Sequence, residues 1–175
     1  MISIEHSEYL LKIPKKVKLK GILEDQIEFQ TNLPIQSYFI LTSPEESEFS
    51  FLYDINQSSK NHFKLSLYLM CEDTKVGLLR VDYNGQHINP EGLIDTLPEK
   101  FHKYAGKFFE YDEPHIHYNV DGYKNLVWAL PLENDLFEVK SLNNQNDVVS
   151  AILHFNKLIN LETKFLTGTQ FLDLH

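Results

Sequence analysis

Residues 62–84 read HFKLSLYLMCEDTKVGLLRVDYN and contain two short, mostly apolar runs separated by a polar segment. The runs HFKLSLYLMC (62–71) and VGLLRVDYN (76–84) are rich in aromatic, aliphatic and β-branched residues, and each has the length of an ordinary β-strand. The intervening EDT (72–74) consists of turn-forming residues. This stretch therefore predicts two consecutive strands and places the chain in a class with an antiparallel sheet.

Further runs of the same kind extend the sheet on both sides of this stretch. They are QSYFILT (36–42), EFSFLYDI (48–55), PHIHYNV (114–120) and NLVWALPL (125–132). Asp121-Gly122 lies between the last two runs and predicts a tight hairpin turn, because both residues tolerate positive φ. The near-continuous apolarity around Trp128 is typical of a central strand that is covered on both faces.

Two helices are expected to flank the sheet. The first covers residues 4–13, with Ser3 as its N-cap and Pro14 as its stop. The second lies in DVVSAILHFNKLINLE, where apolar residues recur at helical spacing after an N-cap candidate in Asn146 or Asp147. A helical turn is also expected in LPEKFHKYAG, within the long link between two strands. The prediction is one α+β domain over residues 1–175, a mostly antiparallel sheet flanked by a short N-terminal and a C-terminal helix.

The composition limits the classes of function. The formal net charge of −9 opposes loose, charge-driven binding to nucleic acid, although it suits a protein that occupies a basic partner. One cysteine, Cys71, excludes an intrachain disulfide and fits a reducing, cytoplasmic compartment. No signal peptide or apolar stretch of membrane-spanning length is present, so no membrane association is expected. The lysines of KIPKKVKLK (12–20) are interpreted as a solvated segment, with a phosphate-facing or partner-facing arm as the alternative.

Alternation within two strands predicts one polar cluster. In LLRVDYN, Arg80 and Asp82 face away from the apolar side, and in PHIHYNV, His115 and His117 do the same together with Asn119. If these strands pair or lie one strand apart, the side chains gather on one face, where a histidine of the following loop, QHINPEG, can reach them. The candidate catalytic residues are therefore His115, His117, Arg80, His87 and Asp82.

Three interpretations of this cluster are open. In metal-independent phosphodiester cleavage, one imidazole takes the proton of the 2′-hydroxyl group, the other protonates the leaving oxygen, and Arg80 stabilises the charged phosphorane. In a metal site, His115 and His117 present two imidazoles to one ion, with His87 or Asp82 as third ligand. In the third interpretation, the same side chains form an inert hydrogen-bonded network that holds a long loop.

Several motifs resemble an uncharacterised bacterial domain family. They are EYLLKIPKKV (8–17), LLRVDYNGQHINPEG (78–92), EPHIHYNVDGY (113–123), VWALPL (127–132) and AILHFNKLINLE (151–162). The order of these motifs covers most of the chain, and the resemblance implies an architecture more than an activity. The strand, His-containing loop and Pro-His-x-His element are also similar to small toxins of bacterial toxin–antitoxin pairs. That similarity implies an RNA-directed activity, with His87, His115 and His117 in the place of the toxin histidines.

The function expected from the sequence is that of a cytoplasmic bacterial accessory or defence protein that acts on RNA through this cluster. One alternative is a non-enzymatic acidic protein that binds a basic or nucleic-acid-binding partner, as an inhibitor or antitoxin does. A third is a small metal-dependent hydrolase with histidine ligands. No cofactor is expected, because the chain has no Gly-rich phosphate loop or other cofactor motif. The expected partners are a protein, either an antitoxin or a target, and RNA.

Overall fold

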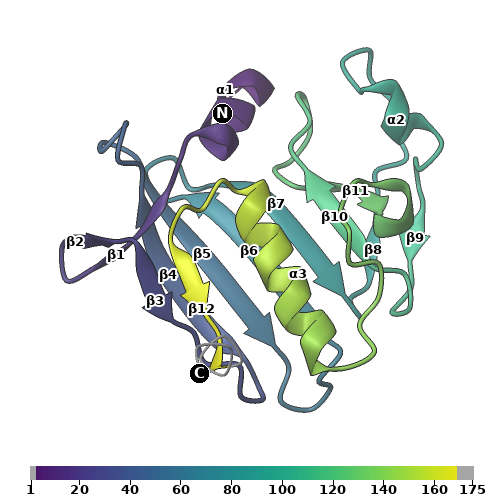
Figure 1. The fold of residues 1–175 in the computed structure, drawn as a ribbon. Coiled ribbons are helices and arrows are strands. Elements are labelled where there is room, and N and C mark those ends of the chain that lie inside the picture. Colours follow the sequence, from purple (N-terminus) through teal and green to yellow (C-terminus); the bar gives the residue numbers. More distant parts are fainter. Residues whose placement is uncertain (1–2, 169–175) are drawn as a thin grey trace.

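The computed structural model describes residues 3–168, and its largest element is an eight-stranded sheet (Figure 1). The strand order is β11-β10-β7-β6-β5-β4-β1-β2, and every neighbouring pair is antiparallel. The strands are β1 (Lys16–Leu19), β2 (Ile22–Glu24), β4 (Gln36–Thr42), β5 (Ser50–Gln57), β6 (Leu65–Cys71), β7 (Val76–Tyr83), β10 (His115–Tyr118) and β11 (Trp128–Pro131). The predicted strand pair within residues 62–84 forms β6 and β7, near the middle of the sheet.

Two short strand pairs lie outside this sheet. The strand β3 (Gln26–Glu28) pairs in parallel with β12 (Lys164–Leu166), which brings segments from both ends of the chain together. The strand β8 (His87–Ile88) pairs with β9 (Phe108–Phe109) within the long link between β7 and β10. None of these four strands was predicted, because each has only two or three residues.

The flanking helices are present as predicted, with corrected boundaries: the first ends at Lys12 instead of residue 13, and the second ends at Leu158, before the end of the predicted segment. The helix α1 (Ile4–Lys12) begins after Ser3, whose hydroxyl oxygen accepts a hydrogen bond from a backbone N–H of the first turn. The helix α3 (Gln145–Leu158) begins earlier than expected, because Asn144 is the cap and its side chain accepts from the N–H of Asp147. The short helix α2 (Glu99–His102) fills the predicted helical turn, and a 3₁₀ turn spans Leu132–Asn134.

The core lies between the sheet and the helices on one face. Figure 1 shows α3 lying across β5 and β6. There the ring of Phe155 stacks on that of Tyr53, with the centroids 5.4 Å apart. Within residues 3–168, no helix has the length and apolarity to cross a bilayer. The α+β class, with a mostly antiparallel sheet and flanking N- and C-terminal helices in one domain, is confirmed.

Three local predictions are wrong. Trp128 is fully buried, but its strand β11 is an edge strand of the large sheet and not a central one. Asp121-Gly122 forms a turn inside the nine-residue connection 119–127, so it does not join β10 and β11 directly. The lysine run is solvated at Lys12, Lys18 and Lys20, as expected, but the prediction is wrong for Lys15, which is completely buried. Distant segments hold two of these positions, because Nζ of Lys15 donates to the carbonyl oxygen of Ile159 and the side chain of Asp121 accepts from the N–H of Ile4.

Candidate metal centre

The polar residues of β7 and β10 share one face of the sheet because the two strands are direct neighbours. In their antiparallel register, Asp82 lies opposite His115 and Arg80 lies opposite His117. The structure therefore brings together four of the five candidate residues through strand pairing alone. Asn119 is not part of the group, because it lies beyond the end of β10 and its amide nitrogen donates to a backbone carbonyl of β7 at 2.6 Å.

His87 reaches the same cluster from β8 but has other hydrogen-bond partners. Its ring centroid lies 4.5 Å from that of His117. Its Nε2 atom lies 2.9 Å from the carbonyl oxygen of Val127 and 3.2 Å from Oδ1 of Asn89. Both partners are acceptors, so Nε2 carries the proton of the neutral ring and donates it to them. His87 thus packs beside the cluster while its Nε2 is engaged elsewhere.

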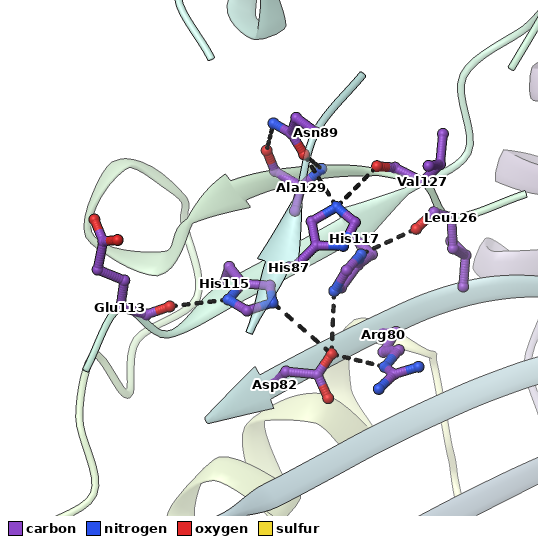
Figure 2. Close-up of polar contacts among 10 residues, drawn as sticks. All are labelled: Arg80, Asp82, His87, Asn89, Glu113, His115, His117, Leu126, Val127 and Ala129. Carbon is purple, nitrogen blue, oxygen red and sulfur yellow. Dashed lines mark hydrogen bonds and ion pairs between the residues drawn. The ribbon is translucent and has the colours of Figure 1, made fainter. Parts of the chain in front are cut away.

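Asp82 lies at the centre of the cluster (Figure 2). Its Oδ2 atom lies 2.7 Å from Nε of Arg80, 3.0 Å from Nε2 of His117 and 4.0 Å from Nε2 of His115. The potential ligand atoms of Asp82, His115 and His117 all lie within 4.8 Å of one another. All three residues are buried, with exposed fractions of 6%, 1% and 5%. Two imidazoles and one carboxylate therefore converge on one small, buried volume.

The other ring nitrogens fix how the two histidines are protonated. Nδ1 of His115 lies 2.9 Å from the carbonyl oxygen of Glu113, and Nδ1 of His117 lies 2.9 Å from that of Leu126. A carbonyl oxygen only accepts, so each Nδ1 carries a proton. In the neutral form of each ring, Nε2 then directs a lone pair toward the carboxylate of Asp82. Within residues 3–168, Nε2 of His115 has no hydrogen-bond partner at all.

Burial and neighbouring charges shift the titration of these groups. Burial lowers the pKa of His115 to about 4, so this imidazole is neutral near pH 7. Burial also lowers the pKa of His87, and the nearby His117 adds to that effect. For Asp82, burial acts to raise the pKa, but a hydrogen bond from the doubly protonated form of His117 and the charge of Arg80 outweigh it and hold the pKa below its usual range. The centre thus offers an ionised carboxylate and a neutral imidazole.

The link between β7 and β10 covers the histidines. The ring of Phe109, in β9, lies 4.7 Å from that of His115 and is fully buried. Asn89 fastens the link to the sheet edge, because its side-chain amide makes both a donor and an acceptor hydrogen bond with the backbone of Ala129, each of 2.9 Å. Asn89 was not among the residues predicted from the sequence. In the sequence, Asn89 precedes a proline in HINPEG, and this pattern indicates a turn but not a contact with β11.

The arrangement has the features of a site for a divalent transition metal. Bonds of about 2.0–2.1 Å in a tetrahedral site place two ligand atoms roughly 3.3 Å apart. The distances of 3.0 and 4.0 Å from Oδ2 of Asp82 to the two Nε2 atoms lie on either side of that value. Histidine ligands usually donate their second ring N–H to a carbonyl or carboxylate, as both rings do here. Asp82, His115 and His117 would be the ligands, and Arg80 would hold the carboxylate from outside.

The fold and cluster define the chain as a one-domain α+β protein with a buried two-histidine, one-carboxylate centre beside an arginine. The chain belongs to a family of unknown function, DUF6978, whose model matches residues 2–161. The predicted membership of an uncharacterised domain family is thereby confirmed. No curated protein and no solved structure gives a match, and the similarity to toxins finds no support in these comparisons.

Proposed function

We propose that this protein is a metal-dependent hydrolase that holds one divalent ion, with Zn²⁺ as the first candidate, through Asp82, His115 and His117. One observation carries the proposal, namely the Nε2 atom of His115, which is buried, neutral and without a partner, and which is directed at a carboxylate. A bare lone pair facing an anion in a buried site is unfavourable. A cation between the two groups turns the same arrangement into a favourable one.

The second histidine supports the same interpretation. Both nitrogens of His117 face oxygen atoms, at 2.9 and 3.0 Å. Without a metal, these contacts require a doubly protonated ring next to Asp82, and that still leaves His115 without a partner. A metal ion satisfies both Nε2 atoms and the carboxylate together. Three protein ligands also leave a coordination position for water, which is typical of hydrolytic zinc sites and rare in structural ones.

The geometry favours this function over metal-independent cleavage of RNA. Acid–base cleavage needs two imidazoles on opposite sides of the reacting phosphate. Here both Nε2 atoms point to the same carboxylate oxygen, and the ligand atoms span no more than 4.8 Å. This arrangement does not place the two imidazoles on opposite sides of a bound phosphate. With one cysteine, Cys71, the chain has no intrachain disulfide, which supports placing the protein in the reducing cytoplasm.

The test is metal binding to untagged protein, so that no affinity tag contributes histidines. Protein stripped with a chelator is titrated with Zn²⁺ by calorimetry, and bound metal is counted by elemental analysis. The expected result is one ion per chain for the wild type and a loss of affinity of at least 100-fold for His115→Gln and Asp82→Asn. His62→Gln, a substitution of an exposed histidine, should bind as the wild type does.

Thermal unfolding gives a second, independent measurement. A ligand that binds only the folded state at 100 times its dissociation constant stabilises it by about 2.7 kcal/mol. Zn²⁺ should therefore raise the melting temperature of the wild type and of His62→Gln, and leave His115→Gln unchanged. A wild type that binds no metal, or a His115→Gln variant that binds it equally well, would show that the cluster is only a structural network.

A further inference from the structure

The outer face of the sheet contains a polar pocket that borders the proposed metal centre. The side chains alternate along β5, β6 and β7, so the residues of two cross-strand rows point away from the core. One row contains Asp54, Tyr68 and Arg80, and the next contains Asn56, Ser66 and Asp82. These six residues, with Lys64 and others, line a pocket of about 420 Å³. The carboxylate of Asp82 thus faces both the histidines and this pocket.

Arg80 is the single arginine among the 16 lysines and arginines of the chain. Its Nε atom donates to Asp82 at 2.7 Å, which orients the guanidinium group. Within residues 3–168, no hydrogen bond or ion pair engages its two terminal nitrogens, and 46% of the side chain is exposed. Its terminal N–H groups are therefore available to a ligand in the pocket. A planar fork of this kind matches the oxygens of a phosphate in a way that a lysine cannot.

The remaining lining suits a small phosphate ester. Lys64 adds a second cation that has no ion-pair partner within the described residues. Asn56 and Ser66 offer neutral hydrogen-bonding groups, and the ring of Tyr68 offers an apolar surface. Asp54 and the ionised Asp82 are the opposing charges. Asp82 is engaged by Arg80 and would be bound by the proposed metal, whereas burial raises the pKa of the Asp54 carboxyl and Arg80 counteracts that shift. The net charge of −9 disfavours a long polyanion much more than a single phosphate group.

We propose that this pocket binds the substrate as a small phosphate monoester, with Arg80 and Lys64 holding the phosphate next to the metal centre. The inference rests on the proposed function, to which it adds the class of substrate. In the reaction, the oxygen of one water molecule bonds to phosphorus, the ester P–O bond breaks, and the alcohol leaves with a proton from that water. Inorganic phosphate and the alcohol are the products, and no oxidant or reductant is needed.

The single arginine makes the binding step directly observable. Protein labelled with ¹⁵N-arginine should give one Nε–H signal in an NMR spectrum, and that signal reports on Arg80 alone. Inorganic phosphate should shift it saturably in the wild type, in both metal-free and zinc-loaded protein. Chloride at the same ionic strength should not. An Arg80 signal that phosphate leaves unmoved in both forms of the protein overturns the proposal, and because the wild type is used, no variant has to fold.

Variants and competing ligands then define the site and its chemistry. Loss of a charged hydrogen bond predicts weaker phosphate binding by roughly 10- to 100-fold in Lys64→Gln, against no change in Lys124→Gln, an exposed lysine outside the pocket. Zinc-loaded wild type should release nitrophenol from p-nitrophenyl phosphate, and p-nitrobenzoate should compete weakly. If p-nitrobenzoate bound as tightly as p-nitrophenyl phosphate, a phosphate monoester would not be the preferred class of substrate. If phosphate shifts Arg80 but no metal binds, the proposed hydrolase fails while the phosphate pocket stands.

Discussion

A buried lysine offers the sharpest test of how this fold is held together. Nζ of Lys15 donates to the carbonyl oxygens of Leu11, Ile13 and Ile159, at 3.0, 2.8 and 3.0 Å, and lies 4.9 Å from the ring centroid of Phe51. These carbonyls lie at the C-terminal ends of α1 and α3, where the helix dipoles are negative. One ammonium group thus joins the ends of both helices. We predict that Lys15→Met changes stability in a strongly pH-dependent way.

The magnitude follows from the pKa of the lysine. Burial lowers the pKa of Lys15 from 10.5 to about 7. Between these values the unfolded chain binds the proton and the folded chain does not, so the stability of the wild type rises with pH in this window. Each pH unit contributes up to about 1.4 kcal/mol, or about 4 kcal/mol between pH 7 and 10. The three carbonyl oxygens favour the ammonium form, so this value is an upper limit.

Methionine keeps the apolar stem but cannot titrate. The difference in unfolding free energy between the wild type and Lys15→Met should therefore grow with pH from 7 to 10. At pH 10 the wild type should be the more stable by about 2 kcal/mol or more, because the variant removes the two N–H donors that the neutral amine still offers to the surrounding carbonyl oxygens. Urea unfolding followed by the fluorescence of the single, buried Trp128 measures both chains, and other titrating groups cancel in the difference.

An exposed lysine provides the control for this measurement. Lys124→Met should differ from the wild type by a small amount that does not vary with pH. A difference for Lys15→Met that stays constant from pH 7 to 10 would refute the reasoning. It would mean that the three carbonyl oxygens compensate fully for burial and that the lysine remains charged throughout the window.

Two further substitutions test packing at the ends of the strands next to the candidate centre. Gly77→Ala should destabilise the protein by about 1–3 kcal/mol in urea unfolding, because the added Cβ would lie 2.6 Å from a side-chain carbon of Leu126. Gly92→Ala is the control and should be nearly neutral, because its added Cβ meets no atom within 4 Å. Asn89→Ala should cost about 3 kcal/mol, because it removes three hydrogen bonds to backbone groups, two of them buried. Asn143→Ala, at an exposed position, is the control and should cost less than 0.5 kcal/mol by the same measurement. If the two asparagine substitutions had equal effects, Asn89 would not stabilise the attachment of the link to β11.

Six of the eight strands of the large sheet could be predicted from runs of apolar and aromatic residues, and the faces of β7 and β10 from alternation alone, whereas β1 and β2 were not predicted. In β7, Leu79, Val81 and Tyr83 are buried on the core side, and Arg80 and Asp82 lie on the other side, as their spacing indicates. Alternation is a local property of one strand, so contacts with distant parts of the chain do not change it. The convergence of Asp82 with His115 and His117 needed only one more fact, that β7 and β10 are neighbours, and the sequence left that open.

The burial of the histidines could not be predicted in the same way. It depends on the link between β7 and β10 folding back, on Phe109 packing against His115, and on Asn89 bonding to the edge of β11. These contacts join residues up to 40 positions apart through single side chains, and no periodic pattern in the sequence predicts them. Lys15 is a similar case, because its carbonyl partner Ile159 lies 144 residues away. A lysine run predicts solvation unless such partners are known.

The location of the polar cluster is itself an argument for a ligand. On the core side of the same strands, the row Leu67, Val81 and Ile116 fixes the register of β6, β7 and β10 with apolar side chains alone. The fold therefore does not need an ionised carboxylate to hold these strands together. Burying a charge and leaving one imidazole nitrogen without a partner lowers stability relative to well-packed apolar residues. Such a cost is expected where function requires it, and a metal ion at this point would remove most of it.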